Sequence, residues 1–394
     1  MPQWIGRFHN RSSIAQFVEE QSGQIAGQII QQGDLWYLQD QSATLELPAA
    51  WIALLPKLSP AWAAFSIGPQ KVQLDYWQER PLSGPLSEQQ TRRFRMIQSI
   101  RQFFLAQDFL ETDTPVRVPN PGMEPFLDSF SAEAGQWLRT SPELHMKRLL
   151  CRGYDRIFQF APSFRKGDFS RLHREEFLML EWYRSFSDLE VLIEDCQHLL
   201  NHLAPQAKDP IYFKQPIQRI TCQEAFHKWV GLDLRDHKDC EPLRAAAKLH
   251  NIHIDPADDW DTLYFRLFLN LVEHHLGEEQ PTILEDYPAS QAALAKRKPQ
   301  SGEFATCYRF ELYVKGVELA NAFYEVCDAN EQRQRFEMDQ LERQAQRKPV
   351  YELDEAFLQA LQQGMPPSAG IALGLDRLVL VVLGHSDLAE ILPF

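Results

Sequence analysis

Two arginines in this chain occupy positions that suit the binding of phosphate. Arg165 ends a strand-like run that begins at Ile157 and forms the first half of a long polar-tipped hairpin, and Arg377 precedes the apolar run at residues 378–383. A guanidinium group binds two oxygens of an anion through its planar fork, and the N-terminal end of a helix also favours negative charge. Either arginine alone would more often be a salt-bridged surface residue, so the pair is a prediction that other residues must support.

Carboxylates interrupt a second apolar stretch, residues 310–328. If this stretch is a strand, strict alternation places Asn321, Phe323 and Glu325 on one face and Glu318 on the other. A buried carboxylate needs a partner such as an ammonium group or a metal ion. The alternative is that Glu318 and Glu325 are solvated at the ends of the strand.

The elements that would position these residues form two regions. Residues 24–31, 35–40, 44–47, 64–67 and 71–76 are predicted strands, with a short helix at 48–58, as in a small oligonucleotide-binding (OB-type) barrel. This region carries five basic and seven acidic residues, which favours a structural or partner-docking role over RNA binding. Residues 81–85 read as a linker. We therefore predict domains at 1–84 and 85–394, with helices starting at Ser87 and covering 188–203.

Composition limits the function classes further. The 394 residues carry a formal net charge of −14, which argues against broad binding to nucleic acid. No apolar run reaches the roughly 18 residues of a membrane span, and the N-terminus does not resemble a signal peptide. The six cysteines show no metal-binding spacing and are expected to be reduced thiols. A cytoplasmic protein without membrane partners is the expectation.

Three segments resemble, in order, the signature motifs of class II aminoacyl-tRNA synthetases. Residues 109–115 resemble motif 1, Phe164-Arg165 resembles motif 2, and the stretch from Gly374 to Arg377 resembles motif 3. The resemblance spans about residues 86–394. It implies an α+β fold, with an antiparallel sheet of six or seven strands flanked by helices, next to the small N-terminal OB-type domain. It also implies a homodimer formed through motif 1.

Within this family the chain resembles the lysyl-tRNA synthetases, and still more their paralogues, the elongation factor P–β-lysine ligases. Residues 140–150, 181–183 and 316–325 carry this likeness. It implies an ATP-dependent, AMP-forming amino-acid ligase that uses ATP and Mg²⁺ and activates lysine or β-lysine as its adenylate.

The resemblance also implies roles for individual residues. Arg165 and Arg377 would be the catalytic residues, which offset charge at the α-phosphate, while Phe177 would stack on adenine and Glu318 would hold Mg²⁺. The implied ATP-binding set is Arg165, Lys166, Asp168, His173, Arg174, Phe177, Glu318, Leu319, Gly374 and Arg377. The implied amino-acid pocket is Ser141, Glu143, Tyr183, Asn321, Phe323, Glu325 and Ala372. Two glutamates in that pocket suit a substrate with two ammonium groups.

Two features bear on the acceptor. The N-terminal region is shorter than the anticodon-reading barrel of lysyl-tRNA synthetases, and Ala372 stands where those enzymes have glycine and the β-lysine ligases have alanine. One methyl group in a tight pocket can shift preference by roughly 1–3 kcal/mol. We therefore expect transfer to a protein, elongation factor P, with charging of tRNA as the alternative.

Two departures concern the ATP site. Lys166-Gly167 stands where motif 2 usually has a glutamate two places after its arginine, for which Asp168 could substitute, and Arg174-Glu175 replaces the usual Asn-Pro. Because these residues lie where ATP is contacted, they put full activity in question. A non-catalytic paralogue that binds an amino acid or a partner is the second alternative.

Overall fold

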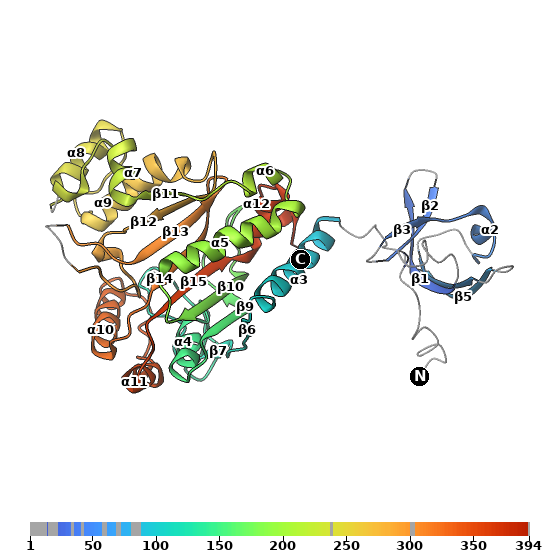
Figure 1. Ribbon diagram of the computed structural model, residues 1–394, viewed down its shortest axis with the longest axis horizontal. Helices are drawn as coiled ribbons and strands as arrows, with labels where there is room; N and C mark the ends of the chain where they lie inside the picture. Colours follow the sequence, from blue (N-terminus) through green and yellow to red (C-terminus); the bar gives the residue numbers. More distant parts are fainter. Residues whose placement is uncertain are drawn as a thin grey trace. The chain divides into compact units, whose positions relative to one another are not determined.

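The computed structural model describes Ile14 and residues 23–32, 35–40, 43–56, 61–67, 72–79, 88–236, 239–299 and 304–392. The chain divides into two compact units, Met1–Phe94 and Arg95–Phe394 (Figure 1). The predicted linker at 81–85 and the predicted helix start at Ser87 lie outside the described residues.

The smaller unit contains a five-stranded antiparallel sheet in the order β3-β2-β1-β4-β5. Its core includes Ile25, Ile29, Leu38 and Phe65, all of them fully buried. The five predicted strands are confirmed, the helix is shorter than predicted, and the arrangement is consistent with an OB-type domain. The elements are β1 (Gly23–Gln32), β2 (Leu35–Gln39), β3 (Thr44–Glu46), α2 (Ala49–Ile52), β4 (Ala61–Ile67) and β5 (Val72–Glu79).

The larger unit is built on an eight-stranded sheet in the order β11-β12-β13-β14-β15-β10-β9-β6. The strands from β12 to β9 pair antiparallel, whereas β11 and β6 each pair parallel with their neighbour. The predicted α+β class is confirmed, but the sheet is mixed because of these two edge strands. The strands are β6 (Leu110–Glu111), β9 (Arg156–Phe164), β10 (Glu176–Ser185), β11 (Gln218–Thr221), β12 (Thr282–Glu285), β13 (Arg309–Val314), β14 (Val317–Tyr324) and β15 (Ser368–Gly374).

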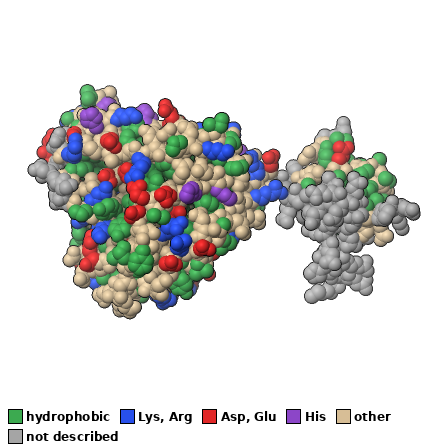
Figure 2. All heavy atoms as spheres, in the orientation of Figure 1, with side chains coloured by type: hydrophobic (Ala, Val, Ile, Leu, Met, Phe, Trp, Pro, Cys, Tyr) green, Lys and Arg blue, Asp and Glu red, His purple; other side chains and the backbone are tan. Residues whose placement is uncertain are grey.

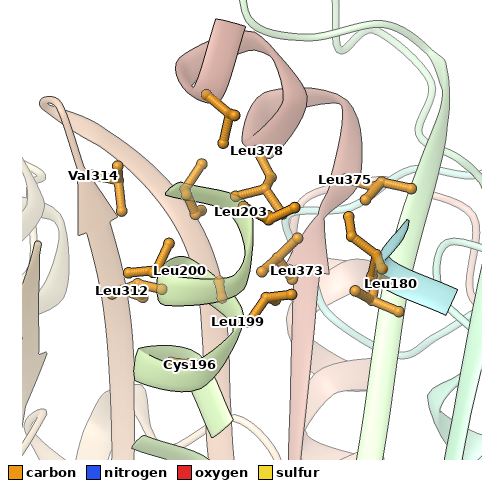
Figure 3. Close-up of a cluster of buried hydrophobic side chains, with 14 of the residues drawn as sticks. Leu180, Cys196, Leu199, Leu200, Leu203, Leu312, Val314, Leu373, Leu375 and Leu378 are labelled. Carbon is orange, nitrogen blue, oxygen red and sulfur yellow. The ribbon is translucent and has the colours of Figure 1, made fainter. Parts of the chain in front are cut away.

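Three helices cover one face of this sheet: α3 (Glu88–Leu105), α5 (Leu189–Leu203) and α12 (Leu375–Leu383). Figure 3 shows leucines of α5 and α12 packed against side chains of the strands. Burying each such side chain contributes about 1.5–3 kcal/mol. Asp188 caps α5 by accepting a hydrogen bond from the backbone N–H of Glu190, as the predicted helix start requires. Because this face is filled with apolar side chains, only the opposite face is left for polar chemistry.

The remaining helices lie around the sheet (Figure 1). Residues of α4, α10 and α11 share one apolar cluster, and α7, α8 and α9 share another. A two-stranded ribbon, β7 (Arg117–Val118) and β8 (Trp137–Leu138), precedes α4. The helices are α4 (Glu143–Cys151), α6 (Pro210–Phe213), α7 (Cys222–Trp229), α8 (Glu241–Leu249), α9 (Trp260–Leu267), α10 (Ala329–Ala345) and α11 (Glu355–Gln363).

Two further observations concern sequence-based expectations. No helix within the described part of the chain is long and apolar enough to cross a bilayer. All six cysteines are free thiols. On the face of the larger unit drawn in Figure 2, acidic, basic and histidine side chains lie among hydrophobic ones, and no single sign of charge covers that face.

Candidate active site

A β-bulge in β14 determines which side chains face the site. Tyr313 of β13 pairs with Glu318 and Leu312 pairs with Ala320, so Leu319 is an extra residue in its strand. Leu319 and Ala320 are both buried in the helix-covered core. The alternation therefore changes at this point, and Glu318 lies on the same face as Asn321. The prediction that the two lie on opposite faces is wrong. The side chain of Leu319 cannot contact ATP, although its backbone could.

The floor of the site is a set of paired positions on three neighbouring strands. Ala372 of β15 lies opposite Glu181 of β10 on one side and opposite Asn321 of β14 on the other. One pair further along, Gly370 lies between Tyr183 and Phe323. Sheet pairing thus brings together four residues of the predicted amino-acid pocket, namely Tyr183, Asn321, Phe323 and Ala372.

Gly370 allows two pocket side chains to approach the floor. A Cβ atom added there would lie 2.6 Å from Oε1 of Glu325 and nearer still to the ring of Tyr183. No side chain fits in that space. Gly370 therefore allows Tyr183 and Glu325 to pack directly over the backbone of the strand.

Glu143, Lys147 and Glu325 form a buried ion cluster. Nζ of Lys147 lies 2.5 Å from Oε1 of Glu143 and 2.5 Å from Oε2 of Glu325, and the side chains of Lys147 and Glu325 are each 1% exposed. Burial opposes the charge of Lys147, but the two carboxylates outweigh it and hold the pKa of Lys147 above its ordinary value. Burial also raises the pKa of Glu325 to about 8, although Lys147 opposes that rise.

Lys147 was not among the predicted site residues. Its position four residues after Glu143, on a helix whose neighbouring Met146 and Leu150 are buried, was the available signal. The predicted residue Ser141 lies just before this helix, where its hydroxyl accepts a hydrogen bond of 3.3 Å from the N–H of Glu143. Ser141 therefore fixes the start of the helix that carries both charged residues.

Glu181 is a further carboxylate in the pocket that the sequence reasoning missed. Its side chain is buried, one oxygen accepts a hydrogen bond of 3.0 Å from the hydroxyl of Tyr183, and the other has no partner among the described residues. Burial, together with the nearby charge of Glu143, raises the pKa of Glu181 well above its usual range. A buried carboxylate oxygen without a partner is costly, and an ammonium group of a ligand would satisfy it. The signal was its place two residues before Tyr183 on a strand.

Arg309 supports the other side of the pocket, and sequence reasoning missed it as well. Its Nε donates to the amide oxygen of Asn321 at 3.1 Å, and its Nη2 donates to Oε1 of Glu311 at 2.6 Å. Its guanidinium lies over the rings of Tyr287, at 4.3 Å, and Phe323, at 5.9 Å. The bond to Arg309 orients the Asn321 amide with its oxygen toward Arg309, so the NH₂ group is the part available to a ligand carboxylate.

The two predicted phosphate-binding arginines lie near each other. Burial lowers the pKa of Arg165, and the positive charge of the nearby Arg377 adds to that effect. Nε of Arg165 is buried without a partner in the described structure, and its guanidinium lies 5.1 Å from the ring of Phe177. Gly374 faces the Arg377 side chain, since an added Cβ would lie 2.8 Å from its Nε. Two neighbouring guanidinium groups, one of them with a buried donor that has no partner among the described residues, suit the binding of an anion.

Glu318 lies at the edge of this anion site. Its Oε2 is 3.8 Å from Nη1 of Arg377, and burial together with the charge of Glu311 raises the pKa of Glu318. Burial and the charge of Glu318 also raise the pKa of Glu273. No group of three or more possible ligand side chains is close enough to hold a metal ion by itself among the residues described. Mg²⁺ usually binds one or two carboxylates together with phosphate oxygens and water, and Glu318, a carboxylate beside the anion site, fits that mode.

The β9–β10 loop contains the remaining predicted ATP residues and the two sequence departures. Gly167 has φ +89°, where a glutamate would be strained, and its N–H donates to Oε1 of Glu175 at 2.8 Å. The guanidinium of Arg174 pairs with Asp387 at 3.3 Å and lies over the ring of Phe169. The two departures are therefore parts of one loop structure.

Lys166, Asp168 and His173 occupy different positions in this loop. Lys166 is exposed, and its N–H donates to the carbonyl of Asp128. Asp168 lies close enough to Arg165 to oppose the lowering of its pKa. Burial and the charge of Arg377 lower the pKa of His173, which places this ring beside the anion site.

The comparisons with known proteins agree with this geometry. A family model described as tRNA synthetases class II (D, K and N) matches residues 83–394. The elongation factor P–(R)-β-lysine ligase of Haemophilus influenzae (strain PittGG) is 39% identical over 312 residues, which cover 77% of this chain and 93% of the relative. The enzyme of that name from Salmonella arizonae is 39% identical over 313 residues, with the same shares covered. The resemblance inferred from the motifs is thus confirmed, and the chain belongs to the class II aminoacyl-tRNA synthetase family.

Proposed function

We propose that this protein activates a diamino acid of the lysine type, (R)-β-lysine in preference to α-lysine, as its adenylate and transfers it to a lysine of elongation factor P. The observation that carries the proposal is the arrangement of charge. Three carboxylates lie near one another in the pocket, the buried Glu181 and Glu325 and the 13% exposed Glu143, and the guanidinium groups of Arg165 and Arg377 form a separate anion site. A substrate with ammonium groups at one end and a carboxylate to be joined to phosphate matches this order.

In the first step, an oxygen of the substrate carboxylate attacks the α-phosphorus of ATP. The bond from that phosphorus to the bridging oxygen breaks, and pyrophosphate leaves. Arg165 and Arg377 stabilise the negative charge that develops on the phosphate oxygens, and Phe177 offers a ring for adenine to stack on. The ammonium groups held by the carboxylates fix the direction of the substrate, so positioning supplies much of the rate.

Mg²⁺ would be held by Glu318 together with phosphate oxygens, and it would offset phosphate charge when bound. Glu318 is suited to this because its side chain is partly exposed at the edge of the anion site and its Oε2 lies 3.8 Å from Nη1 of Arg377.

In the second step, the uncharged amine of the acceptor lysine attacks the carbonyl carbon of the adenylate. The bond from that carbon to the AMP oxygen breaks, AMP leaves, and the amine proton passes to solvent. The names of the relatives support elongation factor P as the acceptor, and the family model matches this chain from residue 83 onward. We place the reaction in the cytoplasm, and we propose a homodimer formed through the motif 1 segment with a domain boundary near residue 84.

The test is amino-acid-dependent exchange of pyrophosphate into ATP, with α-lysine, (R)-β-lysine and the other amino acids tried separately. Faster exchange with (R)-β-lysine supports the proposal, and purified elongation factor P should then gain a stable amide. Preference for α-lysine, with an alkali-labile ester formed on added tRNA, would instead identify a tRNA-charging enzyme. No exchange with any amino acid, beside an active synthetase run in parallel, would identify a non-catalytic paralogue.

A further inference from the structure

The ammonium group of Lys147 occupies the space between two carboxylates of the amino-acid pocket. It lies 2.5 Å from an oxygen of Glu143 and 2.5 Å from an oxygen of Glu325. Glu143 belongs to the first turn of α4, whereas Glu325 follows the end of β14. Lys147 is therefore the charged link between a helix and a strand that are far apart in the sequence.

Each partner has a second oxygen that Lys147 does not occupy. The close contacts of Lys147 use Oε1 of Glu143 and Oε2 of Glu325, and Oε1 of Glu325 lies over Gly370 beside Tyr183. The carboxylates would repel each other and rotate apart without a positive charge between them. With Lys147 in place, their remaining oxygens keep fixed positions next to Glu181.

We propose that Lys147 is a positioning residue of the amino-acid pocket, whose ammonium group fixes the Glu143 and Glu325 carboxylates and favours their charged form, so that the pocket selects an amino acid with two ammonium groups. This inference rests on the proposed function. It adds a residue that acts on the substrate through its neighbours and that does not itself need to touch it.

The charges of the pocket support this selection. Glu143, Glu181 and Glu325 supply three negative charges when ionised, and Lys147 supplies one positive charge, so two negative charges remain. A diamino acid brings two positive charges on its ammonium groups. An amino acid with a single ammonium group would leave one buried carboxylate without a partner, which is costly.

Several other groups act on this cluster, and any change of pH acts on them together. Electrostatic interactions link Lys147 to Glu124 and Cys327, and link Glu143 and Glu325 to Tyr183. The positive charge of Arg139 also acts on Glu181, where it opposes the rise in the pKa of that carboxyl. The groups outside the cluster that act on it or on its neighbour Glu181 are Glu124, Arg139, Glu181, Tyr183 and Cys327.

The first variant is Lys147→Met, which keeps most of the side-chain volume and removes the charge. At pH 7 we expect the KM for the diamino acid in pyrophosphate exchange to rise at least tenfold, with the KM for ATP within about threefold of wild type. The ratio of the variant's KM for the diamino acid to the wild-type KM should fall as the pH rises from 7 to 9, because the carboxylates then lose their protons without the help of Lys147. Arg148→Met, which removes the next charge on the same helix, is the matched control and should behave as wild type.

A cycle with Glu325→Gln separates charge balance from a packing role. Glu325→Gln leaves one net negative charge in the pocket, and the double variant Lys147→Met/Glu325→Gln restores two. We expect the KM of the double variant for the diamino acid to stay within about threefold of the KM of Glu325→Gln. The rise in KM for the double variant is then much smaller than the product of the rises in the two single variants. Should Lys147→Met fail to fold, this comparison still decides the question.

Three results would overturn the inference. Provided that the wild-type enzyme is active, an unchanged KM for the diamino acid in Lys147→Met would leave Lys147 only a structural role. A ratio of variant KM to wild-type KM that is the same from pH 7 to 9 would lead to the same conclusion. A KM for the diamino acid that is more than tenfold higher in the double variant than in Glu325→Gln would show that Lys147 acts in some other way. If the wild-type protein supports no exchange with any diamino acid, the proposed function itself fails, and the inference fails with it.

Discussion

Ala372 places one methyl group between two polar residues of the pocket. It pairs with Glu181 on one neighbouring strand and with Asn321 on the other, so any change in its volume alters the space between the carboxylate of Glu181 and the amide of Asn321. We expect Ala372→Gly to shift the ratio of kcat/KM for (R)-β-lysine over α-lysine toward α-lysine by about tenfold to 200-fold, which corresponds to roughly 1–3 kcal/mol.

Exchange kinetics with both amino acids would measure this ratio. Ala369→Gly, on the helix-covered face of the same strand, is a suitable control because its side chain belongs to the core. It should cost stability and leave the ratio unchanged. An unchanged ratio in Ala372→Gly would show that the methyl group does not contribute to the choice of substrate.

The protonation of Glu325 gives the pocket a dependence on pH. Burial raises the pKa of Glu325 to about 8, and burial also raises that of Glu181. Because the ionised carboxylate binds an ammonium group, a proton must leave before or during binding. We therefore expect the KM for the amino acid to fall as the pH rises from 6 to 8, by at most about tenfold per pH unit for each proton released.

Exchange assays from pH 6 to 8.5 would show this trend, and calorimetry in buffers of different ionisation enthalpy would count the protons released. The KM for ATP, measured in the same series, serves as the internal control. An amino-acid KM that stays constant over this range would mean that the carboxylates are already ionised in the empty pocket.

At the scale of single elements, the β9–β10 loop has a fixed internal structure. The Glu175 carboxylate accepts the N–H of Gly167, the backbone N–H of Arg165 donates to the carbonyl of Glu175, and Arg174 pairs with Asp387. We expect Glu175→Ala to release the loop and to raise the KM for ATP by about three- to tenfold, since a lost hydrogen bond to a charged group costs about 1.5–3 kcal/mol and part of it is regained from solvent.

Pyrophosphate exchange at varied ATP concentration would measure this effect, and the KM for the amino acid should stay within twofold. Glu176→Ala, at the exposed start of β10, is the matched control. Equal ATP kinetics in Glu175→Ala and wild type would mean that the loop does not need this hydrogen bond in order to hold Arg165.

The elements also show how far sequence reasoning could reach. Apolar periodicity and caps predicted α5 and the five strands of the smaller unit, because these signals are local. The bulge at Leu319 was not predictable from alternation, since an extra residue leaves no sign in a run of apolar letters. Lys147 and Glu181 were missed for a related reason: their function depends on partners that only the folded sheet and helix α4 bring within reach.

At the scale of the whole molecule, every residue placed in the candidate site belongs to the larger unit, Arg95–Phe394. The relatives are matched over 93% of their own length but cover only 77% of this chain, and the family model begins at residue 83. The smaller unit, with its own core around Ile25, Leu38 and Phe65, is therefore an addition to what the relatives share. Its slight net negative charge does not favour a grip on nucleic acid.

Removal of residues 1–84 should consequently leave amino-acid activation intact. We expect the truncated chain to support pyrophosphate exchange within about threefold of the full chain, with unchanged KM values for ATP and the diamino acid, because no group of the pocket or the anion site is lost. Circular dichroism would verify folding, and the full chain is the control. If the smaller unit instead docks the acceptor, transfer to elongation factor P will fall while exchange persists, whereas a loss of exchange in a folded truncated chain would mean that the smaller unit is needed to complete the site.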